Sequence, residues 1–350
     1  MVASQNCGGT AARRRAPDAM PRAGAAGTGG EPAIAVDGVG KHFGQTAALR
    51  GVGWQASAGT VTALLGPNGA GKTTMIRILA TLLRPDAGTA RVCGYDVVRE
   101  PARVQALAGL TGQSLSVDGR LSGPENLAMF GRLHRLPWPV VRARSARLLD
   151  VFGLAEAGKK AVKTYSGGMR RKLDLAVSLM AEPPILFLDE PTTGLDPASR
   201  HALWDIIRGL VGQGTTVLLT TQYLDEADAL AGSVVFINSG EVVATGTPDQ
   251  LKARAGQAQL DLVAASDADF ARLASALGGF QPASDAPHRA VSVAVRGTGT
   301  AGLGTLSAVT ETAVRSGACV ERFSLREPDL DDAYFQLTGH IRPSEAKDTP

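Results

Sequence analysis

The stretch at residues 61–74, VTALLGPNGAGKTT, constrains the fold more than any other part of the chain. Its first five residues are apolar and predict a buried β-strand, and a helix is expected to begin at Lys72. Between them lies a glycine-rich turn. This turn fits the template G-x-x-x-x-G-K-[ST] at every fixed position, with Gly66, Gly71, Lys72 and Thr73. The order strand, loop, helix predicts a phosphate-binding loop within an α/β domain.

The residue types of this loop suit a triphosphate. Glycines let the backbone turn tightly with its N–H groups inward, and the following helix directs its partly positive N-terminus to the same place. The Lys72 ammonium can reach the β- and γ-phosphates, and the Thr73 hydroxyl can ligate Mg²⁺. A plain glycine-rich turn is the alternative. The predicted nucleotide-binding residues are Gly66, Pro67, Asn68, Gly69, Ala70, Gly71, Lys72, Thr73 and Thr74.

The chain is long enough for roughly two domains, with 350 residues of which 44% are hydrophobic and 20% charged. We predict a disordered tail at 1–31, a nucleotide-binding domain at 32–252, a small α+β accessory domain at 253–340 and a tail at 341–350. The first tail carries three adjacent arginines, at positions 13–15. We expect it to be solvated, with contact to anionic lipid or nucleic acid as the alternative.

Composition excludes several other classes. No run approaches 18 consecutive apolar residues, so we do not expect the chain itself to span a membrane. The basic N-terminal residues are not followed by the apolar core of a secretory signal. Three widely spaced cysteines form neither a disulfide framework nor a metal set, which fits a reducing cytosol. A net charge of +3 argues neither for nor against nucleic-acid binding.

Apolar runs and helical patterns alternate along the chain. Strands are expected at 34–44, 48–54 and 89–97, followed from about 100 to 182 by an inserted helical subdomain with helices at 121–136, 140–154 and 166–180. Buried strands are expected at 185–188, 215–220 and 234–237, separated by helices at 197–211 and 224–231. This alternation is typical of a mostly parallel sheet covered by helices, to which a hairpin at 238–241 adds an antiparallel edge.

Two acidic residues end one of the buried strands, in the sequence ILFLDE at 185–190. Open parallel sheets bind their ligands at this end of the strands. ATP hydrolysis needs a carboxylate for the metal and a group that activates water. We therefore expect Asp189 to hold Mg²⁺ through water and Glu190 to act as the catalytic base, with an acidic helix cap as the alternative.

A third motif, Tyr165-Ser-Gly-Gly-Met169, places glycines at the start of a helix and so predicts a second anion site. With the other two motifs it makes residues 33–250 resemble the ATP-binding subunit of an ATP-binding-cassette (ABC) transporter, an α/β P-loop fold. The family motif is usually Leu-Ser-Gly-Gly-Gln, so Ser166, Gly167 and Gly168 match. The resemblance implies that these residues face ATP held by a second ATP-binding subunit. Because the chain has one phosphate loop, we expect a homodimer.

The resemblance implies four further roles. Phe43 would stack on adenine, with a buried edge-strand residue as the alternative. Gln113 would contact Mg²⁺ and water, with a surface glutamine as the alternative. Asp196, in the sequence Gly-Leu-Asp-Pro, would join the sites of the two subunits. Gln222 stands where the family usually has a histidine near the γ-phosphate; glutamine can hydrogen-bond there, but it carries no charge that depends on pH.

Three segments, 165–174, 220–228 and 328–339, are similar to the daunorubicin/doxorubicin-resistance branch of the family. This similarity implies an ATPase with ATP and Mg²⁺ as cofactors, bound peripherally to the cytoplasmic face of the membrane. It would drive export of a drug or natural product through a separate transmembrane subunit docked near 113–135, with no nucleic-acid partner. The alternatives are an ABC ATPase acting in nucleic-acid repair or translation, a regulatory module with weak hydrolysis, and an importer.

Overall fold

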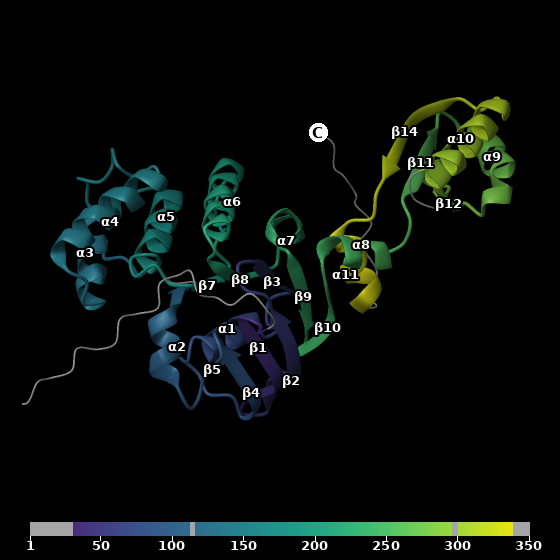
Figure 1. Ribbon diagram of the computed structural model, residues 1–350. Helices are drawn as coiled ribbons and strands as arrows, with labels where there is room; N and C mark the ends of the chain where they lie inside the picture. The colour runs from purple at the N-terminus through teal and green to yellow at the C-terminus, as the bar shows by residue number, and fades with distance from the viewer. Residues whose placement is uncertain (1–30, 113–115, 296–299, 339–350) are drawn as a thin grey trace, which may run out of the picture.

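The computed structural model describes residues 31–112, 116–295 and 300–338. A large unit holds two sheets and most of the helices, and a small unit near the C-terminus stands beside it (Figure 1). Among the described residues, no helix is both long enough and apolar enough to cross a bilayer.

The large unit is centred on a six-stranded sheet in the order β10-β9-β3-β8-β7-β6. Five of these strands run parallel, and β10 pairs with β9 antiparallel at one edge. Every residue of β3, β7 and β8 is buried, as expected for strands covered on both faces. The predicted mostly parallel sheet with an antiparallel edge is therefore confirmed. The strands are β3 (Val61–Leu65), β6 (Ala108–Thr111), β7 (Ile185–Asp189), β8 (Thr216–Thr221), β9 (Ser233–Asn238) and β10 (Glu241–Gly246).

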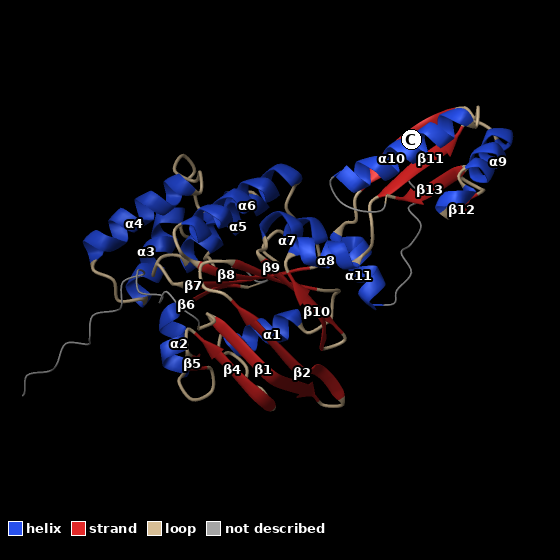
Figure 2. Ribbon diagram, turned by 45° about the vertical axis from the view of Figure 1, so that its right-hand side comes forward, coloured by secondary structure: helices blue, strands red, loops and turns tan. Residues whose placement is uncertain are grey.

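A second, antiparallel sheet has the order β2-β1-β4-β5, and helix α1 (Lys72–Leu79) shares a hydrophobic core with both sheets (Figure 2). The single strand expected at 89–97 is in fact two strands, because Cys93 and Gly94 both adopt positive φ and turn the chain. Helix α1 begins at Lys72, as expected. The strands are β1 (Ile34–Phe43), β2 (Thr46–Ala56), β4 (Ala87–Val92) and β5 (Tyr95–Asp96).

Between β5 and β7 the chain is mostly helical, as predicted, with one strand that the sequence pattern did not indicate. Strand β6 has only four residues, and it extends the sheet beyond β7. A Cβ atom at Gly109 would lie 2.8 Å from the Ser178 carbonyl oxygen, so a glycine lets β6 pack closely against the end of α5 (Gly167–Ser178). The helices are α2 (Pro101–Leu107), α3 (Gly123–Leu133), α4 (Trp138–Val151) and α5 (Gly167–Ser178).

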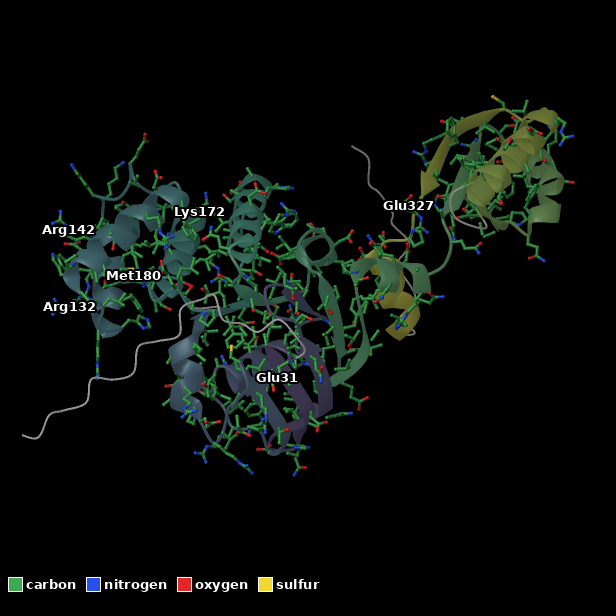
Figure 3. All side chains as sticks on the ribbon, in the orientation of Figure 1. Glu31, Arg132, Arg142, Lys172, Met180 and Glu327 are labelled. Atoms are coloured by element: carbon green, nitrogen blue, oxygen red, sulfur yellow. The ribbon has the colours of Figure 1, made fainter. Side chains whose placement is uncertain are left out.

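Helices α3 and α4 form the outer part of this helical region, where Arg132 and Arg142 extend away from the central sheet (Figure 3). Their inner faces share a core with α5 and the central sheet, built around residues such as Leu127, Phe152 and Leu173. Helices α6 (Pro197–Gly212) and α7 (Leu224–Leu230) connect β7 to β8 and β8 to β9, as expected.

The small unit has the element order β-α-β-β-α-β and the sheet order β12-β13-β11-β14, a split βαβ arrangement. Its own core includes Leu260, Leu273 and Val309. All strand pairs are antiparallel. Its elements are β11 (Gln259–Ala264), α9 (Asp267–Ala276), β12 (Ala283–Asp285), β13 (Ala290–Ala294), α10 (Thr300–Arg315) and β14 (Val320–Arg326).

After the small unit the chain returns to the large one. Helix α11 (Leu330–Thr338) packs beside α8 (Pro248–Arg254), and its Leu330 and Ala333 share a core with Phe236 of β9 (Figure 1). The last helix, although it follows the small sheet in the chain, therefore packs with the nucleotide-binding unit. The sequence pattern predicts a helix at 330–338, where α11 lies, but it does not indicate α8.

Candidate active site

The phosphate loop connects β3 to α1 and is held from outside by other strands. A Cβ atom at Gly66 would lie 2.1 Å from the Ile237 carbonyl oxygen. Gly71 has a φ of 107°, and a Cβ atom there would lie 2.6 Å from the Ala48 carbonyl oxygen. The two glycines of the template are therefore required by close backbone approach as well as by the turn itself.

Lys72 lies beneath this loop and is only 4% exposed. Its Nζ donates to the carbonyl oxygens of Gly66 at 2.7 Å and Pro67 at 3.0 Å, and lies 3.5 Å from a carboxylate oxygen of Glu190. Burial lowers the pKa of Lys72, and the nearby Glu190 and Asp189 carboxylates act in the opposite direction. The ammonium is thus held against the loop carbonyl groups and faces the negative charge of Glu190.

Asp189 lies directly opposite the start of α1 at the end of β7. Its Oδ1 accepts hydrogen bonds from the hydroxyls of Thr73 at 3.1 Å and Thr220 at 2.6 Å, and the side chain is buried. One carboxylate and one threonine hydroxyl beside a phosphate loop form an all-oxygen set, which is the type of site that Mg²⁺ occupies together with phosphates. The donor set therefore fits the magnesium ion expected from the sequence.

Glu190 follows at once and has a left-handed backbone, with a φ of 50°. Its N–H donates to both the carbonyl oxygen, at 3.1 Å, and the hydroxyl, at 3.0 Å, of Thr220 on β8. The next helix, α6, begins with Asp196 as its N-cap. The alternative that the acidic pair caps a helix is therefore wrong, and the Glu190 side chain faces the cavity instead.

An open cavity of about 710 Å³ joins the phosphate loop, Glu190 and the start of α5. Three of the predicted motifs, far apart in the sequence, thus border one space. Its lining residues are Ala48, Asn68, Gly69, Gly71, Lys72, Thr73, Thr74, Gly167, Arg171, Glu190, Thr193, Gly194 and Leu195.

Helix α5 begins with the predicted anion motif. The Ser166 hydroxyl caps the helix by accepting from the Met169 N–H at 3.2 Å. A Cβ atom at Gly168 would lie 3.0 Å from the Ser199 hydroxyl of α6. Tyr165, where the family usually has leucine, is buried in the helical core and its hydroxyl donates to the Ala157 carbonyl oxygen at 2.9 Å. The tyrosine therefore occupies a core position outside the cavity lining.

Phe43, Asp196 and Gln222 are not among the residues that line this cavity. Phe43 at the end of β1 is 50% exposed, so the alternative of a buried core residue is wrong. Hydrogen bonds from the Ser199 hydroxyl and from the Ser199 N–H, the latter at 3.1 Å, hold the pKa of the Asp196 carboxyl below the usual range. Gln222 follows β8 and is partly buried. Gln113 lies outside the described residues.

Sequence reasoning missed Arg171, which lines the cavity one helical turn after Gly167. It lies in the run Met-Arg-Arg-Lys, where adjacent basic residues have no feature that separates a buried arginine from an exposed one. The four-residue spacing of Arg171 from Gly167 is the one available signal, since residues i and i+4 share a helix face.

The comparisons with known proteins agree with this geometry. Residues 49–193 match the family described as ABC transporter. The chain is 48% identical to a daunorubicin resistance ATP-binding protein of Streptomyces coeruleorubidus, covering 89% of this chain and 98% of that one. It is 34% identical to a Nod factor export ATP-binding protein of Ralstonia nicotianae, covering 89% and 96%.

Among solved structures, an ATP-binding subunit of an ABC transporter superposes with a TM-score of 0.58 and 27% identity, covering 63% of this chain and 92% of that one. The fold, the phosphate loop and these relatives agree with the resemblance stated from the motifs. This chain belongs to the ABC transporter family, as an ATP-binding ATPase subunit.

Proposed function

We propose that this subunit hydrolyses ATP to drive export of a drug or natural product through a separate transmembrane subunit. The observation that carries the ATPase part is that Lys72 and Glu190 line one open cavity, while Asp189 accepts a hydrogen bond from Thr73 in the wall of that cavity. The export part is supported by the relatives, whose names refer to daunorubicin resistance and Nod factor export. We place the protein peripherally on the cytoplasmic face of the membrane.

ATP binding would rearrange the contacts of Lys72. In this structure the ammonium is held by two loop carbonyls and by Glu190, at distances of 2.7–3.5 Å. A triphosphate cradled by the loop N–H groups gives the ammonium a more strongly charged acceptor. Glu190 would then lose its ion pair, and its carboxylate would be available to orient and deprotonate the attacking water.

When bound, Mg²⁺ would supply positive charge that stabilises the negative charge of the phosphates during hydrolysis. Asp189, Thr73 and Gln113 would hold it, directly or through water. We further propose that Phe43 stacks on adenine and that Gln222 orients the γ-phosphate.

Ser166, Gly167 and Gly168 would complete the site of a second ATP-binding subunit, and Asp196 would lie at the interface between the two. The binding contacts of the loop would come from the backbone of Gly66–Gly71, in which every residue except Pro67 has an N–H to donate, and from Lys72, Thr73 and Thr74. These roles make the homodimer the working unit. The membrane partner would dock on the helical region that includes α3.

A Glu190→Gln variant tests the assignment of the base. We expect it to bind ATP normally and to lose at least about 100-fold in kcat, since a positioned base contributes about 10²–10⁴-fold. ATP turnover at the wild-type rate would refute the assignment.

The transport role is tested separately, by purifying the tagged chain from detergent-solubilised membranes of its host. A polytopic membrane protein recovered in stoichiometric amount supports the proposal. Recovery of ribosomal or DNA-repair proteins without such a subunit would contradict it, and would leave only the ATPase.

A further inference from the structure

Arg171 is a buried arginine of α5 whose guanidinium is used almost completely by backbone carbonyl groups. The residue is 8% exposed. Its Nε donates to Pro191 at 3.0 Å, and its Nη1 donates to Gly112 at 2.8 Å. Its Nη2 donates to Asp189 at 3.2 Å and to Glu190 at 2.8 Å. Four carbonyl oxygens from two segments thus converge on one side chain.

These four carbonyl groups share a location. Three belong to consecutive residues at the end of β7, including both acidic residues of the site, and the fourth directly follows β6. Only a guanidinium presents N–H donors in a fixed planar fork that can reach all four at once. A lysine ammonium has three donors on a single atom and cannot span them.

The backbone of Glu190 needs such support, because a left-handed φ of 50° is unfavourable for a residue with a side chain. Its N–H is held by Thr220 and its carbonyl group by Arg171. The peptide units on both sides of the Glu190 Cα atom are therefore fixed, and with them the direction in which the carboxylate leaves the backbone.

Arg171 also joins this strand end to the helix that carries the anion motif. Gly167 lies four residues earlier on the same helix, and both residues line the cavity. Asp174 lies three residues later, is 2% exposed, and accepts from the Ser116 N–H at 2.7 Å. Burial lowers the pKa of the Arg171 guanidinium, and the carboxylates of Asp174, Asp189 and Glu190 act in the opposite direction.

We propose that Arg171 is a positioning residue for hydrolysis, which orients the Glu190 carboxylate and couples that orientation to the helix bearing Ser166, Gly167 and Gly168. This inference rests on the proposed function, because it assigns Arg171 to the reaction in which Glu190 is the base. Arg171 acts through the backbone of Glu190 and has no assigned contact with ATP.

The test compares Arg171→Ala and Arg171→Lys with Arg142→Ala in the full chain. Arg142 is an exposed arginine of α4, on the outer face of the helical region (Figure 3). We expect Arg171→Ala to lower kcat by about 10–100-fold, since a shift of about 1 Å in a catalytic group has effects of that size. We expect KM and the affinity for a fluorescent ATP analogue to change less than about threefold, and Arg142→Ala to match the wild type.

Two further readouts separate positioning from a general structural role. Arg171→Lys keeps the charge but reaches fewer carbonyls, so we expect it to fold like the wild type and still lose kcat. Millimolar guanidinium chloride should partly restore kcat of Arg171→Ala, whereas equal potassium chloride should not. If Arg171→Ala does not fold, the kcat of Arg171→Lys decides.

Wild-type kcat in a folded Arg171→Lys protein would overturn the inference, as would equal losses of nucleotide affinity and kcat. Either result would leave the proposed function intact. Absence of ATP turnover in the wild-type chain, both alone and with its membrane subunit, would instead refute the proposed function.

Discussion

Thr220→Val tests directly how the two acidic residues of the site are held, because one buried hydroxyl forms hydrogen bonds with both. Thr220 Oγ1 donates to Asp189 Oδ1 at 2.6 Å and accepts from the Glu190 N–H at 3.0 Å. The residue is 0% exposed and lies in β8 at the centre of the sheet. Valine has nearly the same shape, so the substitution removes the hydroxyl without opening a cavity.

The size of the effect follows from these two bonds. A hydrogen bond to a charged group contributes about 1.5–3 kcal/mol, and Asp189 would lose one. The Glu190 N–H keeps the Thr220 carbonyl group as an acceptor at 3.1 Å, so this group loses less hydrogen-bond energy than Asp189 does. We expect the free energy of unfolding to fall by about 2 kcal/mol. If the Asp189 carboxylate is less well ordered in the transition state by the same free energy, kcat falls by about 10–100-fold.

Urea unfolding and steady-state ATP hydrolysis measure the two quantities. The matched control is Thr216→Val, at the other end of the same strand, where the hydroxyl accepts from the Gly59 N–H at 2.9 Å. We expect the control to lose about 1 kcal/mol of stability and no kcat. Equal kcat values for Thr220→Val and the wild type would refute the reasoning, as would a comparable loss of kcat in the control.

Two other predictions concern residues further from the loop. Phe43→Ala should leave the unfolding free energy within about 0.5 kcal/mol, since the ring is half exposed, but should weaken ATP binding by about 5–150-fold in a titration if the ring stacks on adenine; unchanged affinity would remove the stacking role. Glu226 is fully buried and accepts from Trp204 Nε1 at 3.2 Å, and burial raises the pKa of its carboxyl. The folded state therefore favours the protonated form of Glu226. The stabilising contribution of Glu226 to the free energy of unfolding is complete below the unfolded pKa and is lost as pH rises through the folded pKa. We expect Glu226→Gln to lose less stability than the wild type between pH 5 and pH 8. An equal change of the urea midpoint between these two pH values in both proteins would contradict this.

The sequence predicted the central features of the site because they are local. The phosphate loop, the acidic pair after β7 and the glycines that begin α5 are each contained within a few residues, and the spacing of each follows from its chemistry. Their meeting at one cavity follows from the parallel sheet, since parallel strands end at one edge.

The features that were missed depend on partners far away in the chain or on backbone conformations that the residue types do not reveal. Strand β6 has four small or apolar residues and is stabilised by pairing with β7, 77 positions later at Ile185 opposite Ala108. Arg171 differs from Arg170 only in which face of α5 each occupies. The turn at Cys93, which divides β4 from β5, is set by a positive φ that cysteine rarely adopts and that the sequence pattern does not reveal.

The return of the chain to the large unit after β14 makes the small unit an insertion rather than an appendage. The amide of Gln336 in α11 lies within hydrogen-bond distance of the carbonyl oxygens of Arg254 and Ala255, so the exit from the nucleotide-binding unit and the re-entry to it are adjacent. Insertions between adjacent ends can be exchanged or excised with little effect on the host fold. The last helix, by contrast, covers Phe236 and Leu251 and belongs to the ATPase core. A truncation after residue 252 would therefore remove part of that core, whereas an internal excision that joins α8 to α11 would spare it.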